Sequence, residues 1–430
     1  MKKIICIISI FALVLSSVTV SFGAIALTTA EKYMLSAIDK NKAAITTVAK
    51  EIWGFKELGM QEFKSSKLLM DMLEKEGFKL QRGLVGKDLA NECDVDMPTA
   101  FIATFEGKGK GATIGLLVEY DALPNGHACG HNLISSSCYA AAIGIKEYLK
   151  NNPGTLKVFG TPAEEVLVVK QYIADGGFFE GVDVAYSPHG GNEWTTVLNA
   201  KAMTTTTPGV GLVYTGKASH ASSAPWVGRS ALDAVMLASL GLEFMREHMF
   251  ETDRIHYAII NGGAAANVVH EKAAVDVWIR SDDSLQLLDL LKRAENIFEG
   301  AALMTGTTVE YAWDTICYSA IPVPKLATQA AEAGASLGIK ETFNMTPPSL
   351  GSTDAGNAAF CMPMAFVEFP VDKKPVAGHT DEFAAAAITD YAIDQSILAG
   401  KVMALSAVRL LSNPNDLKAI TEQFKENKGE

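Results

Sequence analysis

The part of the sequence that most constrains the fold is a short polar loop between two apolar runs. The run Thr113–Val118 predicts a buried strand, and the run 133–149 predicts a helix. In the loop between them, His127, Cys129 and His131 alternate with small residues. Positions two apart point to the same side of an extended backbone, so these side chains are expected to converge. Because zinc-like ions prefer imidazole and thiolate, the loop predicts a metal site. The alternative is a loop with a buried cysteine and two surface histidines.

Length and composition are typical of a folded globular protein. The 430 residues suffice for a large core and predict two domains. Hydrophobic residues make up 48% of the chain and charged residues 20%, which excludes a disordered chain. The net charge of −12 disfavours nucleic acid and anionic membranes as partners. Beyond the N-terminal segment the cysteines are widely spaced and odd in number, which does not indicate a disulfide framework.

The N-terminal segment has the layout of a secretory signal peptide. Lys2 and Lys3 precede an apolar run over 4–20, and small residues around Ala24 to Ala26 offer a cleavage site. Residues 1–26 are therefore predicted to be a signal peptide, which implies a periplasmic or secreted protein. The competing interpretation is an uncleaved membrane anchor.

Strands alternate with helices in the first and last parts of the chain. A strand predicted at 155–160 leads to Glu164 and Glu165, and one predicted at 182–186 leads to His189. This alternation predicts an α/β fold with a mostly parallel sheet. Ligands of such sheets sit beyond the carboxyl ends of the strands, where these residues fall.

Two long helices are predicted near the ends of the chain. Thr28 and Glu31 have capping-box spacing and open a helix expected to reach residue 53. The second is expected to run over 380–412 and to stop before Pro414.

The middle of the chain has a different pattern. After a polar join at 204–207 it reads strand, helix, strand, strand, helix, strand, the order of a ferredoxin-like split βαβ sandwich. A lid or dimerisation domain at 199–315 is therefore expected to be inserted into a catalytic domain formed by 27–198 and 316–430. The core-facing side of its first helix is predicted to consist of Leu232, Val235, Met236, Leu240 and Phe244.

The adjacent acids Glu164 and Glu165 suit two different tasks. Their carboxylates diverge, so one can bind a metal while the other acts as a general base. A metal ion lowers the pKa of water, and a neighbouring carboxylate can accept its proton, which is the equipment for hydrolysing an amide. Paired acids in loops are usually only solvated, but histidines His131, His189 and His379 strengthen the catalytic interpretation.

Several motifs together resemble the M20 metallopeptidase family, subfamily D. They are EYDALPNGHACGHN, GTPAEE, the turn at His189, GKASHASSAPWVGRSALDA, INGGAAANVV and GHTDEF, in the order of the family. Within it the chain is most similar to the branch of aminobenzoyl-glutamate hydrolase B subunits. The resemblance implies a catalytic α/β domain with an inserted lid and a centre for two divalent ions, zinc or manganese, with cobalt also acceptable.

The resemblance also assigns roles to individual residues. Glu164 corresponds to the general base and Asp121 to an acid that orients the site. In the lid, His220 corresponds to a residue that reaches the active site of a partner chain, while Asn267 and Arg280 correspond to groups that hold the substrate's carboxylate and developing oxyanion. For Arg280 an ordinary surface ion pair is the alternative. The implied metal ligands are Cys129, which bridges the ions, His131, Glu165, His189 and His379.

The sequence thus predicts a metal-dependent amidohydrolase that cleaves an N-acyl or aminobenzoyl amino acid, such as aminobenzoyl-glutamate. A homodimer is expected, and the resemblance to a B subunit also allows a related second subunit. The partner molecule is a small substrate. One alternative is a dipeptidase or N-acyl-amino-acid deacylase with the same centre. Another, from a different class, is a periplasmic binding protein that kept the fold and lost catalysis.

Overall fold

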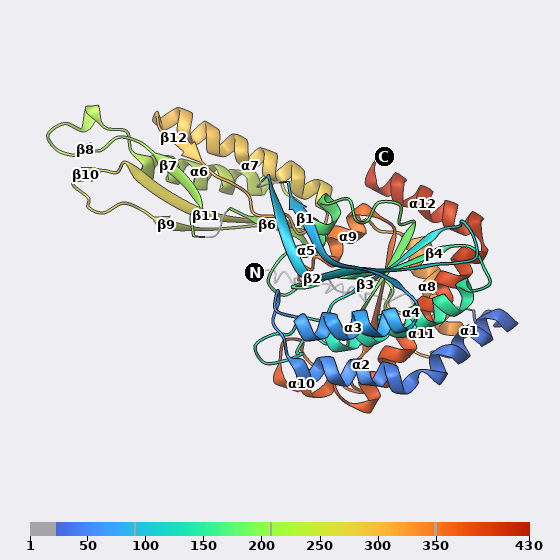
Figure 1. Ribbon diagram of the computed structural model, residues 1–430. Coiled ribbons are helices and arrows are strands. Elements are labelled where there is room, and N and C mark those ends of the chain that lie inside the picture. The colour runs from blue at the N-terminus through green and yellow to red at the C-terminus, as the bar shows by residue number, and fades with distance from the viewer. Residues whose placement is uncertain (1–22, 90–91, 207–208, 348–350) are drawn as a thin grey trace, which may run out of the picture.

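The computed structural model describes residues 23–89, 92–206, 209–347 and 351–430. Figure 1 shows a rounded body from which an elongated arm projects. Most of the predicted signal peptide lies outside the described residues. Within them, no helix has both the length and the apolar character that a membrane span requires.

The body is built on one six-stranded sheet. Its strands β4, β3, β5 and β13 run parallel, while β2 pairs antiparallel with β4 and β1 antiparallel with β2. The predicted α/β fold with a mostly parallel sheet is therefore confirmed. In spatial order the strands are β1 (Lys79–Asp88), β2 (Cys93–Glu106), β4 (Thr155–Gly160), β3 (Thr113–Val118), β5 (Val184–Gly191) and β13 (Met364–Pro370).

Helices cover both faces of this sheet. The two helices α5 (Val169–Asp175) and α9 (Ala355–Cys361) pack with a small apolar cluster on one face. The larger cluster on the other face is almost wholly apolar and forms the main core. The helices on that face are α1 (Thr29–Lys40), α2 (Lys42–Phe55), α3 (Phe63–Lys75), α4 (His131–Leu149), α8 (Pro324–Ser336), α10 (Asp381–Ala386), α11 (Asp390–Ser412) and α12 (Pro414–Lys428).

Both long helices predicted near the ends of the chain are broken in two. The capping box at Thr28 is present, since its hydroxyl accepts from the Glu31 amide at 3.2 Å and its own amide donates to the Glu31 carboxylate at 2.6 Å. The helix that it opens ends at Asn41, where α2 begins in a new direction. The second is interrupted between α10 and α11 because Thr389 caps a new helix, accepting from the Ala392 amide at 3.2 Å.

The arm is an antiparallel sheet with two helices. Its strands lie in the order β12 (Thr308–Glu310), β7 (Leu212–Thr215), β11 (Lys272–Ser281) and β9 (Arg254–Asn261). The strand β6 (Ala202–Thr205) pairs with the end of β11 on the same side as β7. The helices α6 (Ala231–Met245) and α7 (Ser284–Thr305) complete the β-α-β-β-α-β order. The polar join predicted at 204–207 is wrong in part, because β6 occupies its beginning. The domain boundaries remain a prediction.

A short ribbon forms the tip of the arm. It consists of β8 (Ser219–His220) and β10 (Val268–Val269), which pair antiparallel. Two short 3₁₀ turns, η1 (Pro225–Val227) and η2 (Arg246–His248), lie before and after α6. Figure 1 places β8 and β10 at the end of the arm farthest from the body.

The predicted core face of α6 is largely wrong. Val235 is buried, but Met236, Leu240 and Phe244 are 59%, 48% and 66% exposed. The buried face uses small residues instead, since Ala234 and Ala238 pack against the sheet of the arm. The helix therefore has two apolar faces, and one of them is turned to solvent.

Candidate metal centre

The predicted ligands lie in loops and strand ends along one edge of the body sheet. Cys129 follows β3 and lies just before α4, which His131 begins. Glu165 follows β4, His189 is near the end of β5, and His379 lies between β13 and α10. The parallel strands β3, β4, β5 and β13 share an orientation, so their carboxyl ends bring these segments together.

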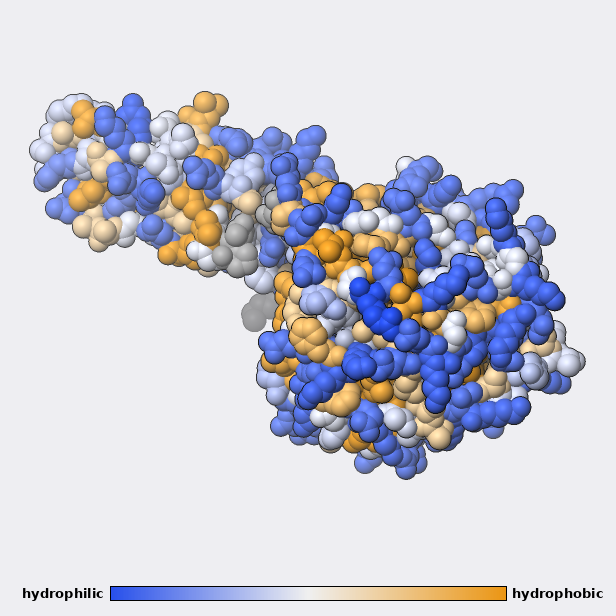
Figure 2. Space-filling model, viewed as in Figure 1, coloured by the Kyte–Doolittle hydropathy of each residue, from blue (hydrophilic) through white to orange (hydrophobic). Residues whose placement is uncertain are grey.

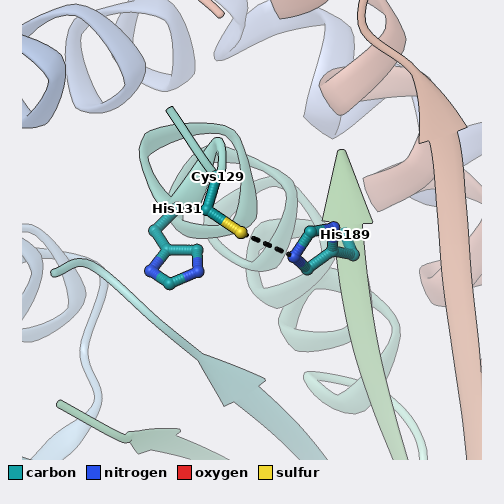
Figure 3. Close-up of side chains that lie close together, drawn as sticks. All are labelled: Cys129, His131 and His189. Atoms are coloured by element: carbon teal, nitrogen blue, oxygen red, sulfur yellow. Dashed lines mark hydrogen bonds between the residues drawn. The ribbon is translucent and has the colours of Figure 1, made fainter. Parts of the chain in front are cut away.

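These side chains converge closely enough to hold metal ions. Figure 3 shows the Cys129 thiol between the rings of His131 and His189, and its sulfur lies 3.5 Å from Nε2 of His189. Potential ligand atoms lie within 4.8 Å of one another in three groups. The groups are Cys129, His131 and His189; Cys129, Glu165 and His379; and His131, Glu164 and Glu165.

Asp121 fixes the orientation of the central histidine. Nδ1 of His131 donates to Oδ1 of Asp121 at 2.9 Å, and the other Asp121 oxygen accepts from the Glu165 amide at 3.0 Å. The remaining nitrogen, Nε2, is thereby directed at the cluster. His189 is held similarly, because its Nδ1 donates to the Gly190 carbonyl at 2.7 Å. Asp121 thus contacts both the His131 ring and the backbone of Glu165.

Two buried atoms of the cluster have no hydrogen-bond partner in the described part of the chain. They are Nε2 of His131 and Oε1 of Glu165, which lie 3.9 Å apart. Buried polar atoms are nearly always paired, so this pair of orphans needs an explanation. Both atoms are of the kind that binds divalent ions, and the residues present therefore fit a metal centre.

A strained turn presents the two glutamates. Ala163 has a φ of 59°, which non-glycine residues rarely adopt. Its amide donates to the buried carboxylate of Glu62 at 2.8 Å, and Glu62 is anchored by the Thr99 hydroxyl at 2.9 Å. This support directs Glu164 and Glu165 towards the cluster.

The electrostatics of the cluster favour a bound cation. Burial raises the pKa of the Glu164 carboxyl to about 8, and the carboxylates of Glu119 and Asp354 add to the rise. Burial also raises the pKa of the Cys129 thiol to about 12. Burial opposes the charged form of His131, but Asp121 and Cys129 together outweigh it and raise the pKa of His131 well above its usual value. A divalent ion would replace these protons by supplying the missing positive charge.

A buried ionic network behind the cluster was missed from the sequence. Lys170 is fully buried and pairs with Glu119 at 2.8 Å and with Asp354. The other Glu119 oxygen lies 3.5 Å from Nε2 of His131, and Thr353, next to Asp354, donates to Glu164 at 2.6 Å. The sequence contains two signals of this network, the acid Glu119 directly after β3 and the Gly-Ser-Thr-Asp loop at 351–354. Neither signal indicates which lysine pairs with these acids.

His127 does not join the cluster, contrary to the prediction from alternation. Its Nε2 lies 2.9 Å from the Ile52 carbonyl, in the interior beside α2. The alternation fails because residues 127–130 form a turn, in which the Gly130 amide donates to the His127 carbonyl at 3.1 Å. Burial lowers the pKa of His127 to about 4, which keeps this imidazole neutral.

The lid residues lie apart from the cluster within one chain. His220 and Asn267 are neighbours at the exposed tip of the arm, where the Asn267 carbonyl accepts from the Ala221 amide at 3.0 Å. Arg280 is on β11, with its guanidinium 5.6 Å from the Trp278 ring centre and a buried Nε without a partner among the described residues. The structure therefore brings together the predicted residues of the body, but not those of the arm.

A cavity of about 430 Å³ opens onto the cluster. Its walls combine the candidate metal ligands with the segments after β5 and β13. They include Glu164, Glu165, Gly191, Phe366 and Glu368. Burial raises the pKa of Glu368 to about 7, which is unusual for a carboxyl on a cavity wall. The volume suits a small molecule of the size of a dipeptide or acylated amino acid.

An α/β body with thiol, imidazole and carboxylate ligands at its strand ends defines a metal-dependent hydrolase. The chain belongs to peptidase family M20/M25/M40, whose model matches residues 115–401. It is thus an enzyme that hydrolyses amide bonds, and the resemblance seen in the sequence is confirmed.

Relatives and solved structures agree with this family. The chain is 34% identical to Xaa-Arg dipeptidase of Homo sapiens over 90% of each chain. It is 36% identical to the B subunit of p-aminobenzoyl-glutamate hydrolase of Escherichia coli over 72% of this chain and 66% of that protein. A Bacillus subtilis structure described as a dinuclear metal-binding peptidase of the M20 family shares the fold, with a TM-score of 0.62, 18% identity, and coverage of 87% of this chain and 99% of that one.

Proposed function

We propose that the enzyme cleaves the amide bond of an N-acyl or aminobenzoyl amino acid, with aminobenzoyl-glutamate as the model substrate. The observation that carries the proposal is the convergence of Cys129, His131 and Glu165 with Glu164, beside a cavity of suitable size. The similarity to the B subunit of p-aminobenzoyl-glutamate hydrolase supports this substrate class.

The proposed roles follow from the contacts of each side chain. Cys129, His131, Glu165, His189 and His379 would hold two divalent ions, with Cys129 shared, because it is common to the group that contains His189 and the group that contains His379. Ions bound there would activate water and polarise the substrate carbonyl.

Glu164 is proposed as the general base. The Thr353 hydroxyl holds one of its oxygens at 2.6 Å, and the other lies 3.9 Å from His131. Glu164 accepts a proton as the water oxygen attacks the carbonyl carbon. It then delivers that proton to the amine nitrogen as the C–N bond breaks.

The arm is proposed to complete the site in a homodimer. His220 at the arm's tip lies far from the body of its own chain in Figure 1, so it is assigned to the partner's site as an oxyanion donor. Asn267, beside it, and Arg280 are assigned to the substrate carboxylate. Exposed apolar side chains support pairing of the arms, including Phe244 on α6 and Ile259 and Ile260 on β9. Apolar residues are also visible on the arm in Figure 2.

Three further properties are proposed from the sequence. Thiolate and imidazole suit zinc, whereas a centre containing carboxylate also accepts manganese or cobalt. The segment 1–26 is proposed to direct export to the periplasm or medium. A related second protein in the assembly is compatible with the similarity to both chains of p-aminobenzoyl-glutamate hydrolase of Escherichia coli, its B subunit and, at 28% identity, its A subunit.

A dipeptidase is the second candidate function, because the similarity to Xaa-Arg dipeptidase covers 90% of the chain. Release of p-aminobenzoate and of free amino acids should be measured on p-aminobenzoyl-glutamate, N-acetyl amino acids and dipeptides. We expect hydrolysis of the aminobenzoyl or acyl substrates, with loss of turnover in a chelator. Turnover of dipeptides alone would favour the second candidate. Binding without turnover of any of these substrates would indicate a binding protein instead.

A further inference from the structure

One carboxylate on the cavity wall has no task in the proposed mechanism. Glu368 is on β13, directly opposite His189 on β5 in the parallel ladder. Neighbouring strands are about 4.8 Å apart, so side chains at paired positions on one face stand side by side. Both residues line the cavity, and the Glu368 carboxylate is therefore close to the catalytic cluster without belonging to any of its ligand groups.

The carboxylate lies against bare backbone. A Cβ atom on Gly191 would be only 1.9 Å from Oε1 of Glu368, so the glycine leaves the space that this carboxylate occupies. The amide of Asn192 donates to it from the same segment. The backbone of β13 at Glu368 is fixed by two hydrogen bonds with Thr195, at 3.0 and 3.3 Å. These contacts hold the acid in place on the cavity wall.

No positive side chain among the described residues forms an ion pair with Glu368. The charged neighbour that acts on it is another acid, Glu193, which increases the demand for a cation. A partly buried carboxylate without a counter-ion is unfavourable, unless a ligand supplies the charge. Phe366 also lines the cavity, and its ring can pack against the alkyl part of a ligand.

We propose that Glu368 selects substrates whose amino-acid side chain carries an ammonium or guanidinium group. This inference rests on the proposed amide hydrolysis and replaces the glutamate of the model substrate with a cationic amino acid. It predicts that a lysine or arginine derivative is a better substrate than the corresponding glutamate derivative. The relative described as an Xaa-Arg dipeptidase has a cationic residue in its named substrate.

The test uses two substrate series, p-aminobenzoyl-X and alanyl-X, in which X is lysine, norleucine or glutamate. Norleucine has the chain of lysine without the charge. In at least one series the wild type should prefer lysine to norleucine by about tenfold or more in kcat/KM, and glutamate should be poorest. Glu368→Gln should lower kcat/KM for lysine by about 10- to 100-fold, as expected for a hydrogen-bonded charge pair, and leave norleucine nearly unchanged.

The control is Glu193→Gln, which removes the charge of the neighbouring acid. Glu193 lies outside the cavity, where its carboxylate accepts a hydrogen bond from the Asn344 side chain at 2.8 Å. It should leave the lysine preference intact. Three results would overturn the proposal: no lysine preference in either series, an equal loss on all substrates in Glu368→Gln, or loss of bound metal in that variant. If the wild type turns over neither the lysine nor the norleucine substrates, the proposed function fails. Calorimetric binding of the lysine and norleucine compounds then still tests Glu368.

Discussion

At the scale of single residues, the Cys129 thiol shows how strongly the cluster depends on a cation. Burial raises its pKa to about 12, so the thiolate forms only if a metal replaces the proton. Ser at this position keeps the shape but is a poor ligand for a soft or borderline ion. Cys129→Ser should therefore lose bound metal and activity together, measured by elemental analysis and amide hydrolysis.

Cys138 is the matched control for that substitution. It lies in the core on α4, where its thiol donates to the Leu117 carbonyl at 3.1 Å. Cys138→Ser should retain metal and most of the activity, because serine can make the same hydrogen bond. Equal losses in the two variants would contradict the assignment of Cys129 as a ligand.

Lys170 is expected to matter for stability. Its removal would leave Glu119 and Asp354 facing each other in the interior. Lys170→Met should lower the free energy of unfolding by about 3–5 kcal/mol in urea denaturation, because a buried charge loses its partner. The control is Lys67→Met, because Lys67 pairs with Asp71 at the surface, where the two side chains are 70% and 54% exposed. This variant should lower the free energy of unfolding by less than about 1 kcal/mol. A loss in Lys170→Met as small as that in Lys67→Met would show that the buried network contributes little to stability.

At the scale of elements, α6 gives a direct test of the homodimer. Phe244 belongs to the apolar face that the helix turns to solvent. Phe244→Glu should shift the protein from dimer to monomer in sedimentation or light scattering, because a charge would be buried against the partner. Phe63→Glu is the control, since Phe63 on α3 of the body is 58% exposed and should not affect assembly. A dimer unchanged by Phe244→Glu would move the interface elsewhere.

The same helix shows what the sequence can and cannot predict. Regular runs predicted β3 and β4 to the residue, because buried parallel strands are short and apolar. Periodicity matches the buried face of α7, where Leu287, Leu290 and Phe298 recur at helical spacing. Periodicity failed on α6, because an apolar face turned to solvent has the same periodicity as one that packs on the core.

The candidate site was predictable where function depends on residue type. Thiol, imidazole and carboxylate at strand ends indicated the ligand set, and the family resemblance assigned the acids. The partner of Lys170 was not predictable, because Asp354 lies 184 positions away and only the fold joins them. The exclusion of His127 depended on the turn over 127–130, which composition does not reveal.

At the scale of the whole molecule, the proposed mechanism requires that two chains share each site. His220 is exposed at the tip of the arm, and its Nδ1 accepts from the amides of Ser222 and Ser223 at 3.2 Å, which leaves Nε2 as a donor. His220→Ala should keep the fold and the metals but lower kcat by about 10²–10³-fold, as for loss of one oxyanion donor.

Mixing of chains checks whether His220 acts across the dimer. Inactive His220→Ala and Glu164→Gln proteins, mixed under conditions that exchange protomers, should recover part of the activity, because a mixed dimer has one intact site. No recovery despite demonstrated exchange would confine His220 to its own chain or remove it from catalysis.

The central claim is that the cluster hydrolyses amides with Glu164 as the base beside the metals. The most direct measurement is the metal content and kcat of Glu164→Gln on the best substrate of the panel. We predict a metal content near that of the wild type, about two ions per chain, with kcat lower by about 10²–10⁴-fold. Loss of the metals with the activity would make Glu164 a ligand, and an unchanged kcat would show that the proton is taken by another group.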